Sequence, residues 1–117
     1  MKKEAALIVA LDVPDRSSML ETLSRMPEEI AWYKVGLELF CAEGPTILDP
    51  LRERGASIFL DLKFHDIPRT VGHAVARAAD LGVDLMTVHA AGGRAMLEEA
   101  AQAASRVGGQ GSSGQSG

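Results

Sequence analysis

The chain has 117 residues, 46% of them hydrophobic and 24% charged, a composition typical of a globular domain that excludes disordered and fibrous proteins. A formal net charge of −4 and few aromatic residues (one Trp, one Tyr and three Phe) argue against a nucleic-acid-binding protein, which needs a basic surface or stacking platforms. The apolar runs are too short for a membrane span or a signal peptide, and the single cysteine, Cys41, suits a reducing compartment, so we expect a cytoplasmic protein.

Four short apolar runs, each bounded by Gly, Pro or Asp, predict β-strands. The runs are continuously apolar rather than alternating, which is typical of strands that are buried on both faces of a parallel sheet. In chain order the predicted strands cover residues 7–11, 32–35, 57–62 and 85–88.

Helical spacing of apolar residues predicts a helix after each strand. The first begins at a capping box formed by Ser18 and Glu21. The second ends before Gly55, and Pro50 in its interior is expected to kink it. The first predicted helix extends to about residue 26. The other three cover about residues 45–54, 67–81 and 94–105.

The alternation of strand and helix predicts the fold class. Strand starts lie about 25–28 residues apart, and such crossovers give an α/β fold with parallel strands and outer helices. A doubly wound sheet and a (β/α)8 barrel both fit, but the turn at residues 12–15 lacks the glycines of a dinucleotide-binding turn. Four βα units are half of a barrel, which usually needs about 250 residues. The βα units occupy residues 1–106, and we expect a flexible Gly/Ser/Gln tail in residues 107–117.

Charged residues end three of the predicted strands. Asp61 and Lys63 lie two apart in the third strand, so their side chains point to one face. Lys34 ends the second strand and Asp12 ends the first. Barrel enzymes hold their catalytic groups at the carboxyl ends of the strands. Charges in a buried strand cost free energy, which favours a functional role for them. A solvated ion pair of little energetic value is the alternative interpretation.

The longest motif in the chain is Asp61-x-Lys63-x-x-Asp66-Ile67-x-x-Thr70. With Leu11-Asp12-Val, Lys34-Val-Gly-Leu-Glu-Leu and Thr87-Val-His89-Ala, it makes residues 5–106 resemble the orotidine 5′-phosphate decarboxylase family. The resemblance implies a (β/α)8 barrel that forms a homodimer with active sites at the interface. It also implies conversion of orotidine 5′-monophosphate to UMP and CO2 in pyrimidine biosynthesis, with no metal or organic cofactor.

The resemblance assigns a role to each residue of the motifs. Asp12 would bind ribose hydroxyls, and Lys34, Asp61 and Lys63 would form a charged array beside C6 of the pyrimidine. Lys63 would protonate C6 after CO2 leaves, because a fixed ammonium group both stabilises and quenches the carbanion.

The resemblance also counts Asp66 among the catalytic residues, and Ile67 and Thr70 among the substrate-binding ones. Asp66, Ile67 and Thr70 would project into the active site of the partner subunit. His89 ends the fourth strand and is either a second contact to the site or a packed, hydrogen-bonded histidine.

Two other functions stay open. Sugar-phosphate enzymes of the same superfamily share the Asp-x-Lys-x-x-Asp motif and use Mg²⁺, but they carry Glu where Lys34 stands, and an ammonium group repels a divalent cation. The family's phosphate-binding arginine and closing loop belong to the half of the barrel that this sequence lacks, so we expect weak or no activity of the chain alone. A non-catalytic half-barrel module that assembles with a second copy or with a separate half is the other alternative.

Overall fold

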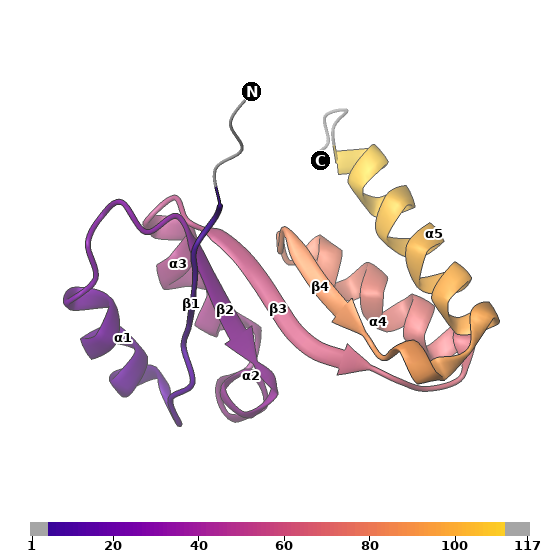
Figure 1. Ribbon diagram of the computed structural model, residues 1–117, viewed down its shortest axis with the longest axis horizontal. Coiled ribbons are helices and arrows are strands. Elements are labelled where there is room, and N and C mark those ends of the chain that lie inside the picture. Colours follow the sequence, from indigo (N-terminus) through magenta and orange to yellow (C-terminus); the bar gives the residue numbers. More distant parts are fainter. Residues whose placement is uncertain (1–4, 112–117) are drawn as a thin grey trace. The chain divides into compact units, whose positions relative to one another are not determined.

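The computed structural model describes residues 5–111, which fold into alternating strands and helices (Figure 1). Two compact units divide between Asp61 and Leu62. The first unit contains β1 (Ile8–Ala10), α1 (Arg16–Ser24), β2 (Trp32–Gly36), α2 (Leu37–Glu43), a 3₁₀ helix (Pro45–Leu48), α3 (Asp49–Glu53) and most of β3 (Ser57–Phe64). The second contains the end of β3, α4 (Pro68–Asp80), β4 (Leu85–Val88), a 3₁₀ turn (Ala90–Gly92) and α5 (Arg94–Gly111).

The strands follow the order β1-β2-β3-β4, so each strand neighbours the next one in the chain. In the first unit β1 pairs with β2 and β2 pairs with β3, both in parallel. Ala10 lies opposite Lys34, and Gly36 lies opposite Asp61. The predicted strand positions and the parallel pairing are confirmed, although β1 is shorter than expected and β3 continues to Phe64.

The sheet of the first unit is covered on one face only, so the prediction of strands buried on both faces is wrong. Burial alternates along β2 and β3: Tyr33 and Leu60 are fully buried, whereas Trp32 and Lys34 are only partly covered. The core contains side chains of the helices as well as of the strands, namely Leu11, Met19, Leu23, Tyr33, Val35, Leu39, Ile47, Leu48, Leu51, Ile58 and Leu60.

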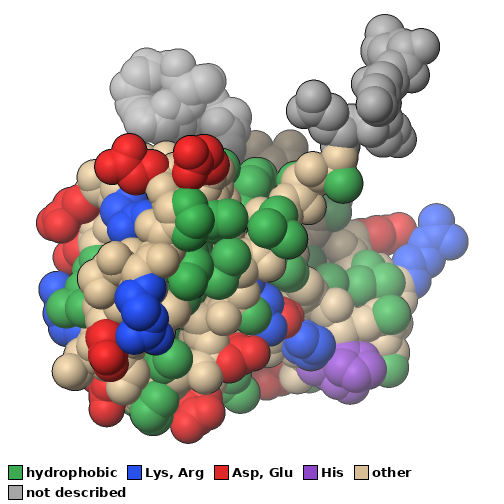
Figure 2. All heavy atoms as spheres, turned by 60° about the vertical axis from the view of Figure 1, so that its left-hand side comes forward, with side chains coloured by type: hydrophobic (Ala, Val, Ile, Leu, Met, Phe, Trp, Pro, Cys, Tyr) green, Lys and Arg blue, Asp and Glu red, His purple; other side chains and the backbone are tan. Residues whose placement is uncertain are grey.

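Large hydrophobic side chains also remain at the surface of the first unit. Leu7 is 68% exposed, and Leu37 on α2 is 58% exposed. Figure 2 shows hydrophobic side chains interspersed with acidic and basic ones on the face that it presents. An apolar run in the sequence therefore marks a strand here without saying how many of its faces are covered.

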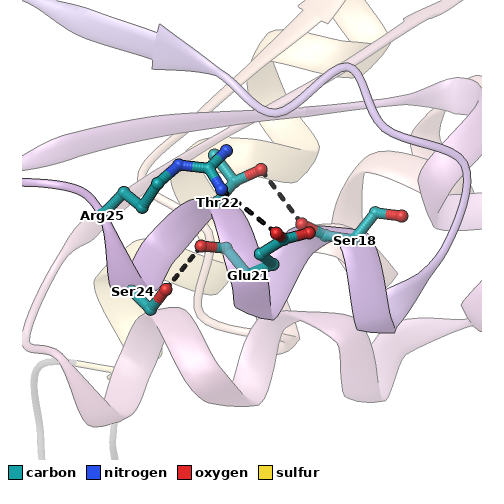
Figure 3. A network of polar contacts seen from close by, with 5 residues as sticks. All are labelled: Ser18, Glu21, Thr22, Ser24 and Arg25. Carbon is teal, nitrogen blue, oxygen red and sulfur yellow. Dashed lines mark hydrogen bonds and ion pairs between the residues drawn. The ribbon is translucent and has the colours of Figure 1, made fainter.

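Helix α1 begins earlier than the sequence predicts, and its N-cap is Asp15. The Asp15 carboxylate accepts a hydrogen bond from the Ser18 N–H at 2.9 Å. The predicted capping box is therefore wrong. Ser18 is not the N-cap: it lies three residues after Asp15, at the position whose N–H bonds to the side chain of an N-cap residue. Ser18 and Glu21 lie inside the helix: the Ser18 carbonyl accepts from the Thr22 hydroxyl at 3.0 Å, and Glu21 pairs with Arg25 at 3.3 Å (Figure 3).

The Asp15 cap makes stability depend on pH. The Ser18 N–H, and after it the Ser18 hydroxyl, holds the pKa of Asp15 below its ordinary value. A lowered pKa in the folded state stabilises the fold above the ordinary pKa of an aspartate, and this contribution is lost as pH falls through the folded value. We expect Asp15→Ala to lower the thermal midpoint at pH 7 and to reduce the loss of stability in acid. Asp15→Asn keeps an acceptor and should stay near the parent at pH 7, and equal midpoints for all three proteins would contradict the cap.

The segment between α1 and β3 is more finely divided than predicted. Helix α2 was not predicted, because its seven residues are too few to show a helical period; it ends at Gly44, which has φ of +79°. The predicted helix over residues 45–54 is a 3₁₀ helix followed by α3. Pro50 does not kink a helix, because it lies in the first turn of α3, where a missing N–H is tolerated. Gly55 follows α3 with φ of +72°, as predicted for a residue that ends a helix.

The second unit is built on two helices that pack side by side, α4 and α5 (Figure 1). Its core cluster consists of Val71, Val75, Met96, Ala100 and Ala103. Helix α5 continues past the predicted end near Ser105 to Gly111, over the first part of the predicted tail, and residues 112–117 lie outside the described part of the chain. No helix between residues 5 and 111 is both long and apolar enough to cross a membrane.

Met96 is the largest fully buried side chain of that cluster, with no exposed surface. Removing its thioether leaves a cavity that the two helices can only partly fill, so we expect Met96→Ala to lower the free energy of unfolding by about 2–5 kcal/mol. Met96→Leu nearly conserves volume and is the matched control, with an expected loss below about 1.5 kcal/mol. Urea unfolding of both variants checks this, and equal losses would show that the site is not tightly packed.

Candidate active site

The first unit brings three of the predicted residues together in a charged cluster of Asp12, Lys34 and Asp61. The Lys34 ammonium lies 3.8 Å from Asp12 Oδ1 and 3.7 Å from Asp61 Oδ2. Lys34 alternates with the buried Tyr33 and Val35, and therefore points to the uncovered face of the sheet. The prediction that charges at the ends of neighbouring strands meet is confirmed for these three residues.

Lys34 is shared between a largely covered carboxylate and an exposed one. The Asp61 side chain is 12% exposed and that of Lys34 is 25% exposed, whereas Asp12 is 71% exposed. Both distances exceed those of hydrogen bonds, so the contacts are ion pairs. Because solvent screens exposed charges, the pair with Asp61 is the stronger of the two. The cluster thus holds one cation firmly beside Asp61 and leaves Asp12 open to solvent.

Gly36 also belongs to this site, although the sequence analysis does not single it out. It lies opposite Asp61 in the register of β2 and β3. A Cβ at this position would lie 3.9 Å from Asp12 Oδ1, and any longer side chain would reach into the cluster. A glycine two residues after Lys34, at the end of the strand, is the sequence signal that was available.

Lys63 is held in an unusual backbone conformation. Its φ is +54°, and among the described residues it is the one non-glycine residue with positive φ. This conformation costs about 1–2 kcal/mol for an L-residue. The Lys63 N–H donates to the Thr87 hydroxyl oxygen at 3.0 Å. The prediction that Lys63 and Asp61 point to one face assumes an extended backbone up to and including Lys63. The left-handed backbone of Lys63 does not meet this assumption.

Asp66 and Ile67 lie in the loop between β3 and α4, at an open cavity of about 540 Å³. The Asp66 carboxylate accepts a hydrogen bond from the Ile67 N–H at 2.7 Å. Ile67 is 64% exposed, and Thr70 in the first turn of α4 is also exposed. The residues lining the cavity come from this loop, the start of α4 and the 3₁₀ turn after β4: His65, Asp66, Ile67, Pro68 and Gly92.

His89 is packed against a second histidine next to this cavity. Its ring stacks on that of His65, with 4.8 Å between the centroids and 24° between the planes. The His89 Nδ1 accepts from the Ala91 N–H at 3.1 Å, which fixes the tautomer that carries its proton on Nε2. His89 also donates its backbone N–H to the Phe64 carbonyl at 2.8 Å. His89 is thus hydrogen-bonded, as the second interpretation predicts, but it is exposed rather than packed in the core.

The sequence is similar to one protein family over almost its whole length. A family model described as orotidine 5′-phosphate decarboxylase / HUMPS family matches residues 5–113. The orotidine 5′-phosphate decarboxylase of a Nostoc species is 54% identical over 97 residues, and that of Fusobacterium nucleatum is 48% identical over 108 residues. The two alignments cover 83% and 92% of this chain but only 40% and 45% of the relatives. The chain therefore spans less than half the length of these relatives.

Solved structures agree with this result. The crystal structure of orotidine 5′-phosphate decarboxylase from Lactobacillus acidophilus matches with a TM-score of 0.78 at 39% identity, over 86% of this chain and 45% of that one. An uncharacterized conserved protein from Geobacillus kaustophilus matches with the same TM-score at 46% identity, over 86% and 46% of the two chains. The predicted fold class is confirmed: the βα units are those of half a (β/α)8 barrel.

Proposed function

Because this chain belongs to the orotidine 5′-phosphate decarboxylase / HUMPS family, we propose that it supplies the charged residues at which orotidine 5′-monophosphate is converted to UMP and CO2. The charged cluster carries this proposal: one ammonium group, Lys34, pairs with both Asp12 and Asp61 on the uncovered face of the sheet. Lys63 follows Asp61 after a single residue, at the end of the same strand. Together these four side chains supply two cations and two carboxylates for the chemical step.

The reaction needs a proton donor and stabilisation of negative charge. The bond between C6 and the carboxylate carbon breaks, CO2 leaves, and the electron pair stays at C6. The Lys63 ammonium stabilises this charge and then gives its proton to C6, which leaves the amine neutral until solvent returns a proton. Lys34 keeps Asp61 charged and oriented beside the substrate carboxylate, and Asp12, the most exposed of the cluster, binds the ribose hydroxyls.

A second copy of the chain completes the site in this proposal. Asp66 acts there as a catalytic side chain of the partner, and Ile67 and Thr70 contact the substrate. Their support is their position in one loop and helix start, with Ile67 and Thr70 exposed to solvent. We propose a homodimer that acts in the cytoplasm, with His89 in a supporting position behind the loop.

A metal-dependent sugar-phosphate enzyme is the second candidate, since the family model spans more than the decarboxylases. One observation opposes it. The Lys34 ammonium already lies within 3.8 Å of both carboxylates, in the position from which a divalent cation would bind them. A non-catalytic assembly module is the third candidate, since one face of the sheet in the first unit is only partly covered.

The test is decarboxylation of orotidine 5′-monophosphate, followed by the loss of its ultraviolet absorbance. The chain is assayed alone and with the remaining, C-terminal part of the Nostoc relative, each with and without Mg²⁺. We expect metal-independent turnover that is weak or absent alone and rises when the second part is added, because remote phosphate binding normally drives the chemical step. Turnover of a sugar phosphate that requires Mg²⁺ would favour the second candidate. No turnover with either substrate would favour the assembly module.

A further inference from the structure

The hydrogen bonding of β3 changes at Lys63. Lys63 and Phe64, the last two residues of β3, form hydrogen bonds with different kinds of group on the side of β4. The Lys63 N–H donates to a side-chain oxygen, the Thr87 hydroxyl, at 3.0 Å. The Phe64 carbonyl returns to main-chain pairing and accepts the His89 N–H at 2.8 Å. At Lys63 the main-chain N–H therefore bonds to a side-chain hydroxyl rather than to a main-chain carbonyl.

That residue is also the one with the left-handed backbone. With φ at +54°, Lys63 does not follow the alternation of a regular strand, so its side chain is aimed differently from that of an extended residue. Local departures of this kind next to active sites re-aim a side chain, and they persist only where the surroundings hold them. One contact in these surroundings is the hydrogen bond from the Lys63 amide to the hydroxyl of Thr87, 24 residues away in the sequence.

We infer that Thr87 is a positioning residue for Lys63: its hydroxyl holds the left-handed conformation and thereby orients the lysine ammonium that protonates C6. The inference deepens the proposed function and rests on it for the catalytic part. The chemistry of Thr87 fits this role, since its hydroxyl accepts a hydrogen bond and its β-branched side chain has few rotamers. Proton transfer depends steeply on orientation, so a relaxed Lys63 should react more slowly while the substrate still binds.

The first test addresses the structure and needs no activity. In the full chain labelled with ¹⁵N, the Lys63 amide is followed by hydrogen exchange and by its coupling to Hα, which reports φ. Thr87→Val, which has the same shape but no acceptor, should raise the exchange rate of this amide at least tenfold and change the coupling. Thr87→Ser should keep both near the parent values. An unchanged Lys63 amide in Thr87→Val would overturn the inference.

The second test addresses catalysis, in the assay described above. Thr87→Val should lower kcat at least tenfold with KM changed less than twofold, and Thr87→Ser should restore kcat. If Thr87→Val does not fold, Thr87→Ala and Thr87→Ser form the second pair, since they differ by one hydroxyl oxygen. Equal kcat for the variants with and without the hydroxyl would overturn the positioning role. If the parent shows no turnover even with the C-terminal part added, the proposed function fails, and the amide measurements still decide whether Thr87 holds Lys63.

Discussion

Lys63→Ala should abolish decarboxylation, with kcat lower by at least about 10³-fold under conditions in which the parent chain turns over. The variant loses both the charge that stabilises the carbanion and the proton that quenches it. Because Lys63 is exposed at the end of β3, the substitution should leave the fold intact. Turnover is measured by the absorbance of orotidine 5′-monophosphate, with circular dichroism as the control for folding.

Two further variants separate the causes. Lys63→Arg keeps a positive charge but does not release its proton in the relevant pH range, so it should recover substrate binding without recovering kcat. Arg77→Ala removes an exposed charge on the same unit and should leave activity unchanged. Activity of Lys63→Ala within tenfold of the parent would show that the proton comes from another group.

Lys34→Glu should change the metal dependence of the chain. It converts two ion pairs, at 3.7 and 3.8 Å, into repulsive contacts and places three carboxylates together. We expect a loss of activity of about 10²-fold or more and a lower thermal midpoint without metal. Three carboxylates are suitable ligands for Mg²⁺, and metal at about ten times its dissociation constant should restore about 1.4 kcal/mol of stability.

Thermal melting with and without Mg²⁺ is the measurement. Lys34→Met is the matched control: it loses the cation without adding a carboxylate, so Mg²⁺ should raise its midpoint less than that of Lys34→Glu. The parent should not respond, because Lys34 already neutralises the carboxylates. Equal stabilisation of the parent and of Lys34→Glu by Mg²⁺ would contradict this account and would support the metal-dependent candidate.

The order of the elements and the charged cluster were predictable because they depend on local patterns. The run at residues 85–88 coincides with β4, and Lys34 and Asp61 meet because the carboxyl ends of parallel strands share one edge. The cap of α1 was predicted at Ser18 rather than Asp15 because both residue types suit a cap and only the backbone decides between them. Burial of both faces was overpredicted, since the runs containing Trp32 and Lys34 do not show which face the helices cover.

The backbone of Lys63 lay beyond sequence reasoning for a different reason. No rule of local propensity predicts a lysine in the left-handed region. In its left-handed conformation Lys63 donates its N–H to a hydroxyl 24 residues further along the chain. That hydrogen bond exists only after β3 and β4 have come together. Thr87 was noted in the sequence as part of a motif, and nothing in the motif indicated its partner.

The sequential strand order has a consequence for how the chain acquires its structure. Each strand neighbours the one that precedes it in the chain, and the contact that holds Lys63 spans 24 residues. Short loops close at little entropic cost, and folds with local contacts form quickly. We therefore expect each βα unit to fold onto its predecessor, so that Lys34 meets Asp12 in the first pair of strands before it meets Asp61 in the third strand.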